Sequence, residues 1–149
     1  MKKIFLLADD DGDDKQLFRE ALEAVDPSVV CYCVDNGQEA LDLLSNQEKP
    51  HLIFLDINMP GMNGWQCLKA IKDNEAYKHI PIIIYSTSGH QREVDIAIDL
   101  GALCFFTKPH NFNELKKILQ VIAANVHGNL LEAVSHFANI KFRANPLDG

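Results

Sequence analysis

The sequence predicts a doubly wound α/β domain, in which a parallel sheet of five strands carries helices on both faces. Five short runs rich in β-branched and aromatic residues recur along the chain, and most are continuously apolar, as is typical of strands covered on both faces. Segments with the apolar spacing of helices separate these runs. The 149 residues are 47% hydrophobic and 23% charged, which suits one domain with a sizeable core.

The predicted strands are separated by residues that favour turns. The strands begin near Ile4, Val29, Leu52, Ile82 and Leu103. Pro50 and Pro81 stand before the third and fourth strands, and Asn36-Gly37 follows the second. This punctuation supports five strand–helix units within about 125 residues.

Apolar side chains at helical spacing predict the helices between the strands. The clearest stripes cover residues 17–25, 94–101 and 112–122. Asp13 with Gln16 resembles a capping box that opens the first helix, and Asp26-Pro27 closes it.

The chain after residue 124 does not repeat the strand–helix unit, which predicts a main domain at 1–124 and an extension at 125–149. Apolar residues between Leu130 and Ala138 return at helical spacing and predict a short helix, and residues 143–149 are expected to form a loose tail. We interpret this helix as packing on the domain; a dimer contact is the alternative.

The charge balance excludes several classes of partner. Lys and Arg number 14 against 21 for Asp and Glu, a formal charge of −7, and such a surface repels nucleic-acid phosphates and anionic lipid. The apolar runs are too short to span a bilayer. The four cysteines show no paired ligand spacing, so we expect reduced core residues in a cytoplasmic protein. They are Cys31, Cys33, Cys67 and Cys104.

Polar side chains follow the carboxyl ends of the predicted strands, where ligands bind in open parallel sheets. Asp9 and Asp10 follow the first strand, Asp56 the third, Ser86 the fourth and Lys108 the fifth. If the first and third strands are neighbours, the carboxylates converge, and a divalent cation or a lysine must relieve their repulsion. Carboxylate oxygens with no His or Cys nearby suit Mg²⁺.

Each of these features alone has a structural explanation, because an acidic run can cap a helix and a strand-terminal Asp can cap a turn. Together they are coherent for phosphoryl transfer to a carboxylate. Asp56 would attack as the nucleophile, Mg²⁺ and Lys108 would neutralise the phosphoryl oxygens, and the Ser86 hydroxyl would donate a hydrogen bond to one of them.

At these positions the sequence resembles the receiver domains of response regulators in two-component signalling. Four segments carry the resemblance, at residues 4–11, 55–64, 81–88 and 105–109, and it extends over about residues 3–123. The stretch from Asp56 to Gly64 (Asp-Ile-Asn-Met-Pro-Gly-Met-Asn-Gly) is the most specific part of the resemblance. The resemblance implies a flavodoxin-like strand order of 2-1-3-4-5 and makes residues 1–124 the receiver domain.

The resemblance also implies a role for each site residue. It makes Asp56 the phosphoacceptor, Asp9 and Asp10 the acidic pair that binds Mg²⁺ or Mn²⁺, and the backbone carbonyl of Asn58 a further metal ligand. It makes Ser86 the switch hydroxyl, Phe105 the switch aromatic and Lys108 the lysine of the site, and it implies a cis peptide bond before Pro109.

The resemblance implies a stand-alone phosphoacceptor signalling domain and not an enzyme. The implied phosphodonor is a sensor histidine kinase or a phosphotransfer protein, and the output is a contact with a downstream effector or a second copy of the chain. We hypothesise that phosphorylation draws Ser86 inward and that Phe105 rotates to fill the space, which repacks the face formed by the fourth helix, fifth strand and fifth helix. No direct nucleic-acid or membrane partner is expected.

Two rival functions share this topology. A haloacid-dehalogenase-like phosphatase also uses an Asp nucleophile with Mg²⁺, but it needs a second acid where this chain has Asn58, and usually a cap domain. A flavodoxin-type binding module needs a phosphate-binding first loop, which the acidic residues 9–14 would repel.

Overall fold

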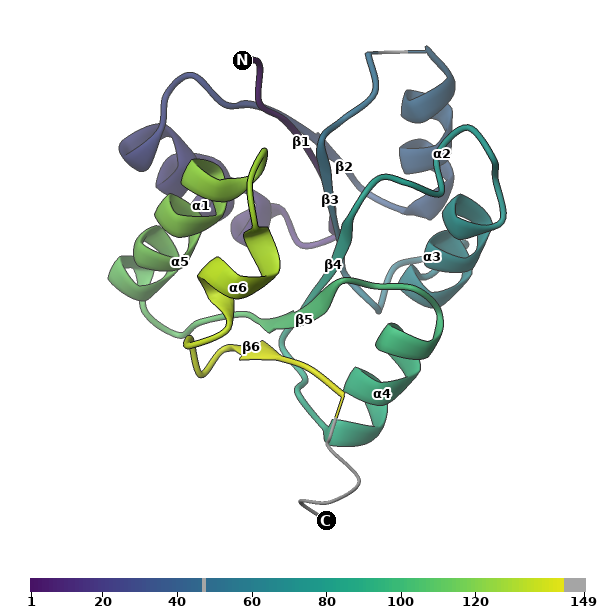
Figure 1. The fold of residues 1–149 in the computed structure, drawn as a ribbon. Coiled ribbons are helices and arrows are strands. Elements are labelled where there is room, and N and C mark those ends of the chain that lie inside the picture. Colours follow the sequence, from purple (N-terminus) through teal and green to yellow (C-terminus); the bar gives the residue numbers. More distant parts are fainter. Residues whose placement is uncertain (47, 144–149) are drawn as a thin grey trace.

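The computed structural model describes residues 1–46 and 48–143, which form a six-stranded sheet in the order β2-β1-β3-β4-β5-β6 with helices on both faces (Figure 1). The strands are β1 (Ile4–Ala8), β2 (Val30–Val34), β3 (Leu52–Leu55), β4 (Ile82–Ser86), β5 (Cys104–Thr107) and β6 (Ile140–Lys141). The helices are α1 (Gly12–Val25), α2 (Gly37–Asn46), α3 (Gly64–Lys72), α4 (Gln91–Asp99), α5 (Phe112–Asn125) and α6 (Leu130–Val134). The doubly wound fold and the order of the first five strands are confirmed.

The central strands are apolar throughout because both of their faces are covered. Every residue of β1, β3 and β4 is buried, and these strands pair in parallel register. One core lies between the sheet and α1, α5 and α6, and the other between the sheet and α2, α3 and α4 (Figure 1). Strand β2 pairs only with β1 among the described residues, and as an edge strand it is half-buried.

The caps of α1 correct one prediction and confirm another. Asp11, and not Asp13, is the N-cap, and its side chain accepts hydrogen bonds from the backbone N–H groups of Asp13 and Asp14. Asp13 therefore lies inside the first turn, where an acid is favoured by the helix dipole. The helix ends at Val25 with Asp26 as C-cap, as predicted.

Several residues of the predicted stripes are exposed. Leu17 on α1 is 44% exposed, although its neighbour Phe18 is fully buried, and Phe112 at the start of α5 is also exposed. Residues at the margin of a helical stripe satisfy the same spacing as core residues, which is why the pattern could not separate them. None of the described helices is both long enough and apolar enough to cross a membrane.

The extension continues the sheet, which the sequence analysis did not predict. Helix α6 packs on α5 as expected. Strand β6 then pairs antiparallel with β5, placing Ile140 opposite Phe106 and Lys141 opposite Phe105. A two-residue strand carries too little alternation to be recognised in a sequence.

The extension is also tied to α4. The Lys141 ammonium donates to the carbonyl of Gly89, which precedes the N-cap residue of that helix, at 3.1 Å. The Gln91 side chain on its first turn donates to the carbonyl of Phe142, and Arg143 forms an ion pair with Asp99 at its last turn. Arg143 is therefore attached, contrary to the predicted loose tail; residues 144–149 lie outside the described part of the chain.

Candidate functional site

Three carboxylates converge at the carboxyl edge of the sheet. Asp9 and Asp10 follow β1, Asp56 follows β3, and β1 and β3 are neighbours, with the Asp56 N–H donating to the Ala8 carbonyl at 2.9 Å. One carboxylate oxygen from each of the three acids lies within 4.8 Å of the others. Asp9 is fully buried, Asp56 is 7% exposed and Asp10 faces solvent. The cluster is thus closed on one side and open on the other.

Lys108, directly after β5, is the cation of the site. Its Nζ lies 2.8 Å from Asp9 Oδ2, 2.9 Å from Asp14 Oδ2 and 3.5 Å from Asp56 Oδ2. The same ammonium lies over the Tyr85 ring, 5.2 Å from its centroid. The lysine therefore offsets part of the negative charge that the carboxylates accumulate.

Asp14 and Tyr85 are site residues that the sequence analysis missed. Asp14 belongs to the acidic run at 9–14, but its position in the first turn of α1, which points it at Lys108, requires the fold. Tyr85 contributes a ring face, and its burial and the nearby carboxylates raise the pKa of its hydroxyl. Tyr85 lies in an apolar strand run, which gives no signal that its ring contacts a site lysine.

The pKa of Asp56 differs from that of an ordinary carboxyl group because of its surroundings. Burial raises the pKa of Asp56 to about 7; Lys108 opposes this increase and the nearby Asp9 adds to it. Burial also disfavours the charged form of Lys108, yet its hydrogen bonds to Asp9 and Asp14 outweigh burial and raise the pKa of the ammonium. Asp56 is consequently a group whose charge state responds to any added cation near neutral pH.

Asp56 is held by local hydrogen bonds. Its Oδ1 accepts the N–H of Ile57 at 2.8 Å, while Oδ2 faces Lys108. The Ile57 carbonyl accepts the N–H of Gly64, which draws the start of α3 against this loop. Asn58 is exposed in the same loop, and the use of its carbonyl as a metal ligand stays a prediction.

Ser86 and Phe105 occupy different environments. Ser86 ends β4 at the same edge of the sheet, opposite Thr107, and its buried Oγ accepts the N–H of Ser88 at 3.3 Å. Phe105 is fully buried in the core on the side of α3 and α4, two residues before Thr107. Ser86 thus belongs to the polar edge, whereas Phe105 lies behind it.

The peptide bond before Pro109 is trans, since none of the described bonds is cis. The cis bond that the resemblance implied is therefore absent, and the structure adopts the isomer that is lower in energy by about 0.5–1 kcal/mol for an X–Pro bond.

The donor set fits a divalent cation. Three carboxylates offer hard oxygen ligands, Asp10 is open to solvent for the water ligands that such ions retain, and one lysine cannot balance four nearby acids. The acidic cluster is thus compatible with a metal of the Mg²⁺ or Mn²⁺ type.

Comparison with known proteins agrees with this geometry. A family model described as the response regulator receiver domain matches residues 5–120. Response regulator Rcp1 of Synechocystis sp. is 31% identical over 126 residues, which are 80% of this chain and 86% of that protein. A chemotaxis protein CheY homolog of Campylobacter jejuni is 29% identical and covers 83% of this chain and 94% of its own.

Solved structures give the same result. The Mn²⁺-bound form of Rcp1 has a TM-score of 0.72 at 31% identity, covering 80% of this chain and 91% of that one. The phosphorylated cyanobacterial phytochrome response regulator RcpA has a TM-score of 0.74 at 31% identity, covering 80% and 90%. The chain belongs to the response-regulator receiver domains, the phosphoacceptor signalling domains of two-component systems.

Proposed function

We propose that the chain accepts a phosphoryl group on Asp56 from a phosphohistidine of a sensor histidine kinase or a phosphotransfer protein. The observation that carries this proposal is the convergence of three carboxylates and Lys108 at one edge of the sheet. Asp56 is the member of the cluster best suited as acceptor, because it is partly accessible while Asp9 is fully enclosed.

In the proposed transfer, an Asp56 carboxylate oxygen attacks the phosphorus atom and the P–N bond of the donor breaks. The leaving imidazole takes the electron pair and gains a proton from solvent. Lys108 balances the charge on the transferred phosphoryl oxygens, and the Ser86 hydroxyl donates a hydrogen bond to one of them.

The metal requirement follows from the same charges. Asp9, Asp10, Asp56 and the Asn58 backbone carbonyl would hold the ion, with Mg²⁺ as the proposed species and Mn²⁺ as the substitute. When bound, it supplies positive charge that favours the ionised form of Asp56 and screens the incoming phosphoryl group. The exposure of Asp10 and Asn58 leaves the side of the cluster through which a donor must approach open.

Phosphorylation is read by a partner through a change at the ends of the neighbouring strands β4 and β5. We assign 1–124 to the receiver domain and 125–149 to an extension that docks on it. Ser86 turns toward the phosphoryl group and Phe105 fills the space, which alters the surface formed by α4, β5 and α5. Because β6 covers the outer edge of β5, the partner, an effector or a second copy, meets the extension as well.

The test is incubation of the purified chain with acetyl phosphate and Mg²⁺, followed by intact-mass measurement. We expect the mass of one phosphoryl group on the wild type and none on Asp56→Asn or after chelation of the metal. Asp13→Asn is the matched control, because Asp13 lies in the same acidic run but outside the three-carboxylate cluster, and it should retain the adduct. An adduct that persists in Asp56→Asn would place the acceptor elsewhere.

A further inference from the structure

Lys108 is shared unequally among the carboxylates that surround it. Its ammonium donates to Asp9 Oδ2 at 2.8 Å and to Asp14 Oδ2 at 2.9 Å. Asp56 Oδ2 lies 3.5 Å away, beyond the usual range of about 2.7–2.9 Å for a hydrogen bond between an ammonium and a carboxylate. In the unphosphorylated chain the lysine is therefore bonded to two acids other than the proposed phosphoacceptor.

Asp14 reaches Lys108 from helix α1, whereas Asp9 follows a strand. The backbone N–H of Asp14 donates to the side chain of the N-cap residue Asp11 at 3.1 Å, which fixes the first turn of the helix. The Asp14 side chain is 29% exposed, while that of Asp9 is fully buried. Among the described residues, the acids that lie close enough together to hold one metal ion are those at positions 9, 10 and 56. Asp14 thus contacts the lysine without being a proposed metal ligand or the phosphoacceptor.

The formation of helix α1 does not explain the contact between Asp14 and Lys108. An acid at the third position of a helix can form a capping box, in which its side chain accepts the backbone N–H of the N-cap residue. Here this N–H, that of Asp11, donates instead to Asp9 Oδ1 at 3.0 Å. The helix dipole favours an acid in the first turn, but it favours the exposed Asp13 in the same way.

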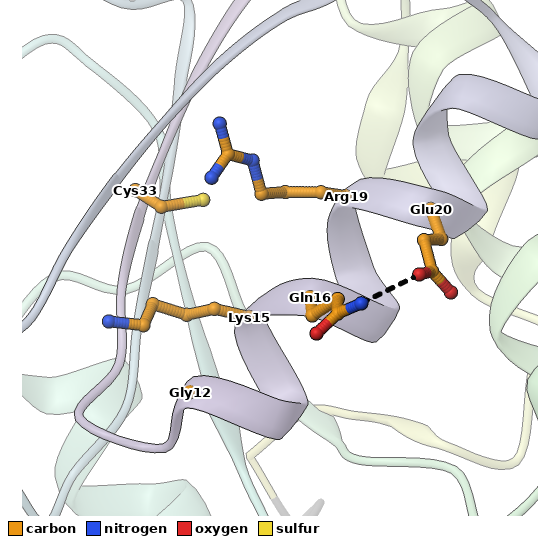
Figure 2. Close-up of a pocket in the computed structure, with 6 residues that line it drawn as sticks. All are labelled: Gly12, Lys15, Gln16, Arg19, Glu20 and Cys33. Carbon is orange, nitrogen blue, oxygen red and sulfur yellow. Dashed lines mark hydrogen bonds between the residues drawn. The ribbon is translucent and has the colours of Figure 1, made fainter.

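The two cations of α1 do not serve as partners of Asp14. Figure 2 shows that Lys15 and Arg19 extend from α1 toward β2, where they line a pocket of about 490 Å³. Lys15 pairs there with Asp35. Within residues 1–46 and 48–143, Lys108 is the one cation that forms an ion pair with Asp14. Asp14 therefore depends on the same positive charge that a phosphoryl group on Asp56 would require.

We propose that Asp14 is a positioning residue that holds Lys108 back from Asp56 and thereby limits phosphoryl transfer to Asp56. This inference rests on the proposed function, because it concerns how readily Asp56 is phosphorylated. A phosphoryl group carries roughly two negative charges, and the single charge of Lys108 is then divided among Asp9, Asp14 and the phosphoryl oxygens. The charge of Asp14 also repels these oxygens directly. Both effects make the transfer less favourable than it would be with a neutral side chain at position 14.

The opposite role, in which Asp14 is needed to orient Lys108 for the transfer, is disfavoured by the other contacts of the lysine. The ammonium is bonded to the buried Asp9, and it lies over the buried Tyr85 ring, 5.2 Å from its centroid. These contacts keep Lys108 at the site when position 14 is neutral. What the lysine then gains is positive charge available to Asp56.

The test measures the initial rate at which acetyl phosphate labels the full-length chain at saturating Mg²⁺, by intact mass. We expect Asp14→Asn to be labelled several-fold faster than the wild type, and the adduct to disappear when Asp56→Asn is added. Asp14→Glu keeps the charge and can still reach the lysine, so its rate should return to that of the wild type. A damaged site would be labelled more slowly, so structural disruption cannot produce the expected gain.

Asp13→Asn is the matched control, because it removes an equal charge from the same helical turn without removing a contact with Lys108. Its rate should equal that of the wild type. A similar gain in both Asn variants would assign the effect to net charge and overturn the role of the contact. Labelling of Asp14→Asn that is no faster than that of a labelled wild type would overturn this inference alone, whereas a wild type that gains no phosphoryl mass would overturn the proposed function as well.

A second measurement follows the lysine without metal or phosphodonor. In protein with isotope-labelled lysine side chains, the NMR resonance of Lys108 Nζ should respond to Asp56→Asn more strongly when Asp14 is also replaced by Asn, because the ammonium then lies closer to position 56. Asp13→Asn should leave this response unchanged. A Lys108 resonance whose response to Asp56→Asn is the same with and without Asp14 would show that Asp14 does not hold the lysine back, and would overturn the inference.

Discussion

Lys108 is the residue that offsets the negative charge of the acidic edge, the group of carboxylates at the carboxyl ends of β1 and β3 (Asp9, Asp10 and Asp56). Its ammonium contacts the carboxylates of Asp9, Asp14 and Asp56, and its side chain is only 9% exposed. Removing one partner of a buried ion pair lowers the free energy of unfolding by more than the pair itself contributes. The remaining charge is then buried without a partner and without solvent. Without Lys108, the three acids could be accommodated only by protonation or by a bound cation.

The first prediction concerns Lys108→Met. In metal-free buffer we expect the free energy of unfolding to fall by about 3–5 kcal/mol, and added Mg²⁺ to restore more stability to the variant than to the wild type. Urea unfolding with chelator and with Mg²⁺ measures both effects. Lys69→Met is the control, since Lys69 pairs with Asp73 at a site 66% exposed and the loss should stay below about 0.5 kcal/mol. Equal losses in the two variants would contradict the buried-charge argument.

The second prediction uses the pKa of Asp56. Because the folded state raises this pKa from 3.8 to about 7, the folded chain binds more protons than the unfolded chain between these values. The stability that the group contributes is fully present at pH values below the unfolded pKa, and it is lost as the pH rises through 7. Asp56→Asn should therefore match the wild type near about pH 4 and exceed it by about 1–3 kcal/mol near about pH 8, without metal.

Denaturant unfolding across this pH range, with chelator present, measures that difference. Asp13→Asn serves as the control, because it removes an exposed acid of the same run that lies outside the three-carboxylate cluster. A gap between Asp56→Asn and wild type that narrows toward alkaline pH would have the wrong sign for a carboxyl whose charge is disfavoured by burial.

At the scale of elements, the contact between α3 and the loop after β3 sets the position of Asp56. Gly64 opens α3, and a Cβ at this position would lie 2.2 Å from the Asp56 carbonyl oxygen and 2.8 Å from Ile57 Cα. These neighbours are backbone atoms, so they cannot move aside without moving the loop. The Asn63 cap and its reciprocal bond with Gln66 fix the helix start in this close approach.

The third prediction compares two glycines that each begin a helix. Gly64→Ala should lower the free energy of unfolding by about 2–3 kcal/mol, and it should also reduce acetyl phosphate labelling, because Asp56 is displaced. Gly12→Ala, at the first residue of α1, has open space around the new methyl group and should be neutral or stabilising by about 0.4–1 kcal/mol. Thermal unfolding and labelling of both variants separate a steric effect from a general preference for glycine at helix starts.

The extension is the second element whose attachment can be measured. Ile140 of β6 is 5% exposed and belongs to the core beneath α5 and α6, whereas Leu131 on α6 is 40% exposed. The fourth prediction is that Ile140→Ala costs about 1–3 kcal/mol and Leu131→Ala less than about 0.5 kcal/mol. Chemical denaturation provides both values. Similar small losses would mean that β6 does not share the cooperative unit of the sheet.

For the whole molecule, the periodicity of the sequence was sufficient to predict the architecture and most residues of the acidic edge. Continuous apolar runs mark β1, β3 and β4 because these strands are buried on both faces, and the residue after each strand end then falls at one edge. Asp9, Asp10, Asp56 and Lys108 were predicted in this way and meet as expected.

The features that were missed depend on contacts between distant segments. Asp14 and Tyr85 join the site only because α1 and β4 pack around Lys108. Strand β6 exists because the β5 edge offers unpaired backbone groups to whichever segment returns to it. Cys31 and Cys33 are half-buried at the margin of the core because β2 lies at an edge, which an apolar run of that length does not reveal.

The loop between β4 and α4 connects the site residue Ser86 with the extension, and the last prediction concerns this loop. Ser86 and Ser88 are joined by a hydrogen bond at one end of the β4–α4 loop, and the Gly89 carbonyl in the same loop accepts from Lys141. The Thr107 N–H also donates to the carbonyl of Asn139, at 2.9 Å. A Ser86 hydroxyl drawn toward a phosphoryl group gives up its bond to Ser88, and the loop that holds Lys141 then shifts.

We therefore expect the beryllofluoride complex, a mimic of the phosphorylated form, to exchange backbone amides faster at residues 88–91 and 139–141 than the free protein, with β2 unchanged. Hydrogen–deuterium exchange with peptide-level mass spectrometry measures this, and Asp56→Asn should show no response. Lys141→Met should raise exchange at 139–141 before any beryllofluoride is added, because it removes the contact with Gly89 in advance. Changes confined to the loop after β3, with 139–141 unaltered, would mean that the extension is a fixed cover of the β5 edge and takes no part in reporting the state of Asp56.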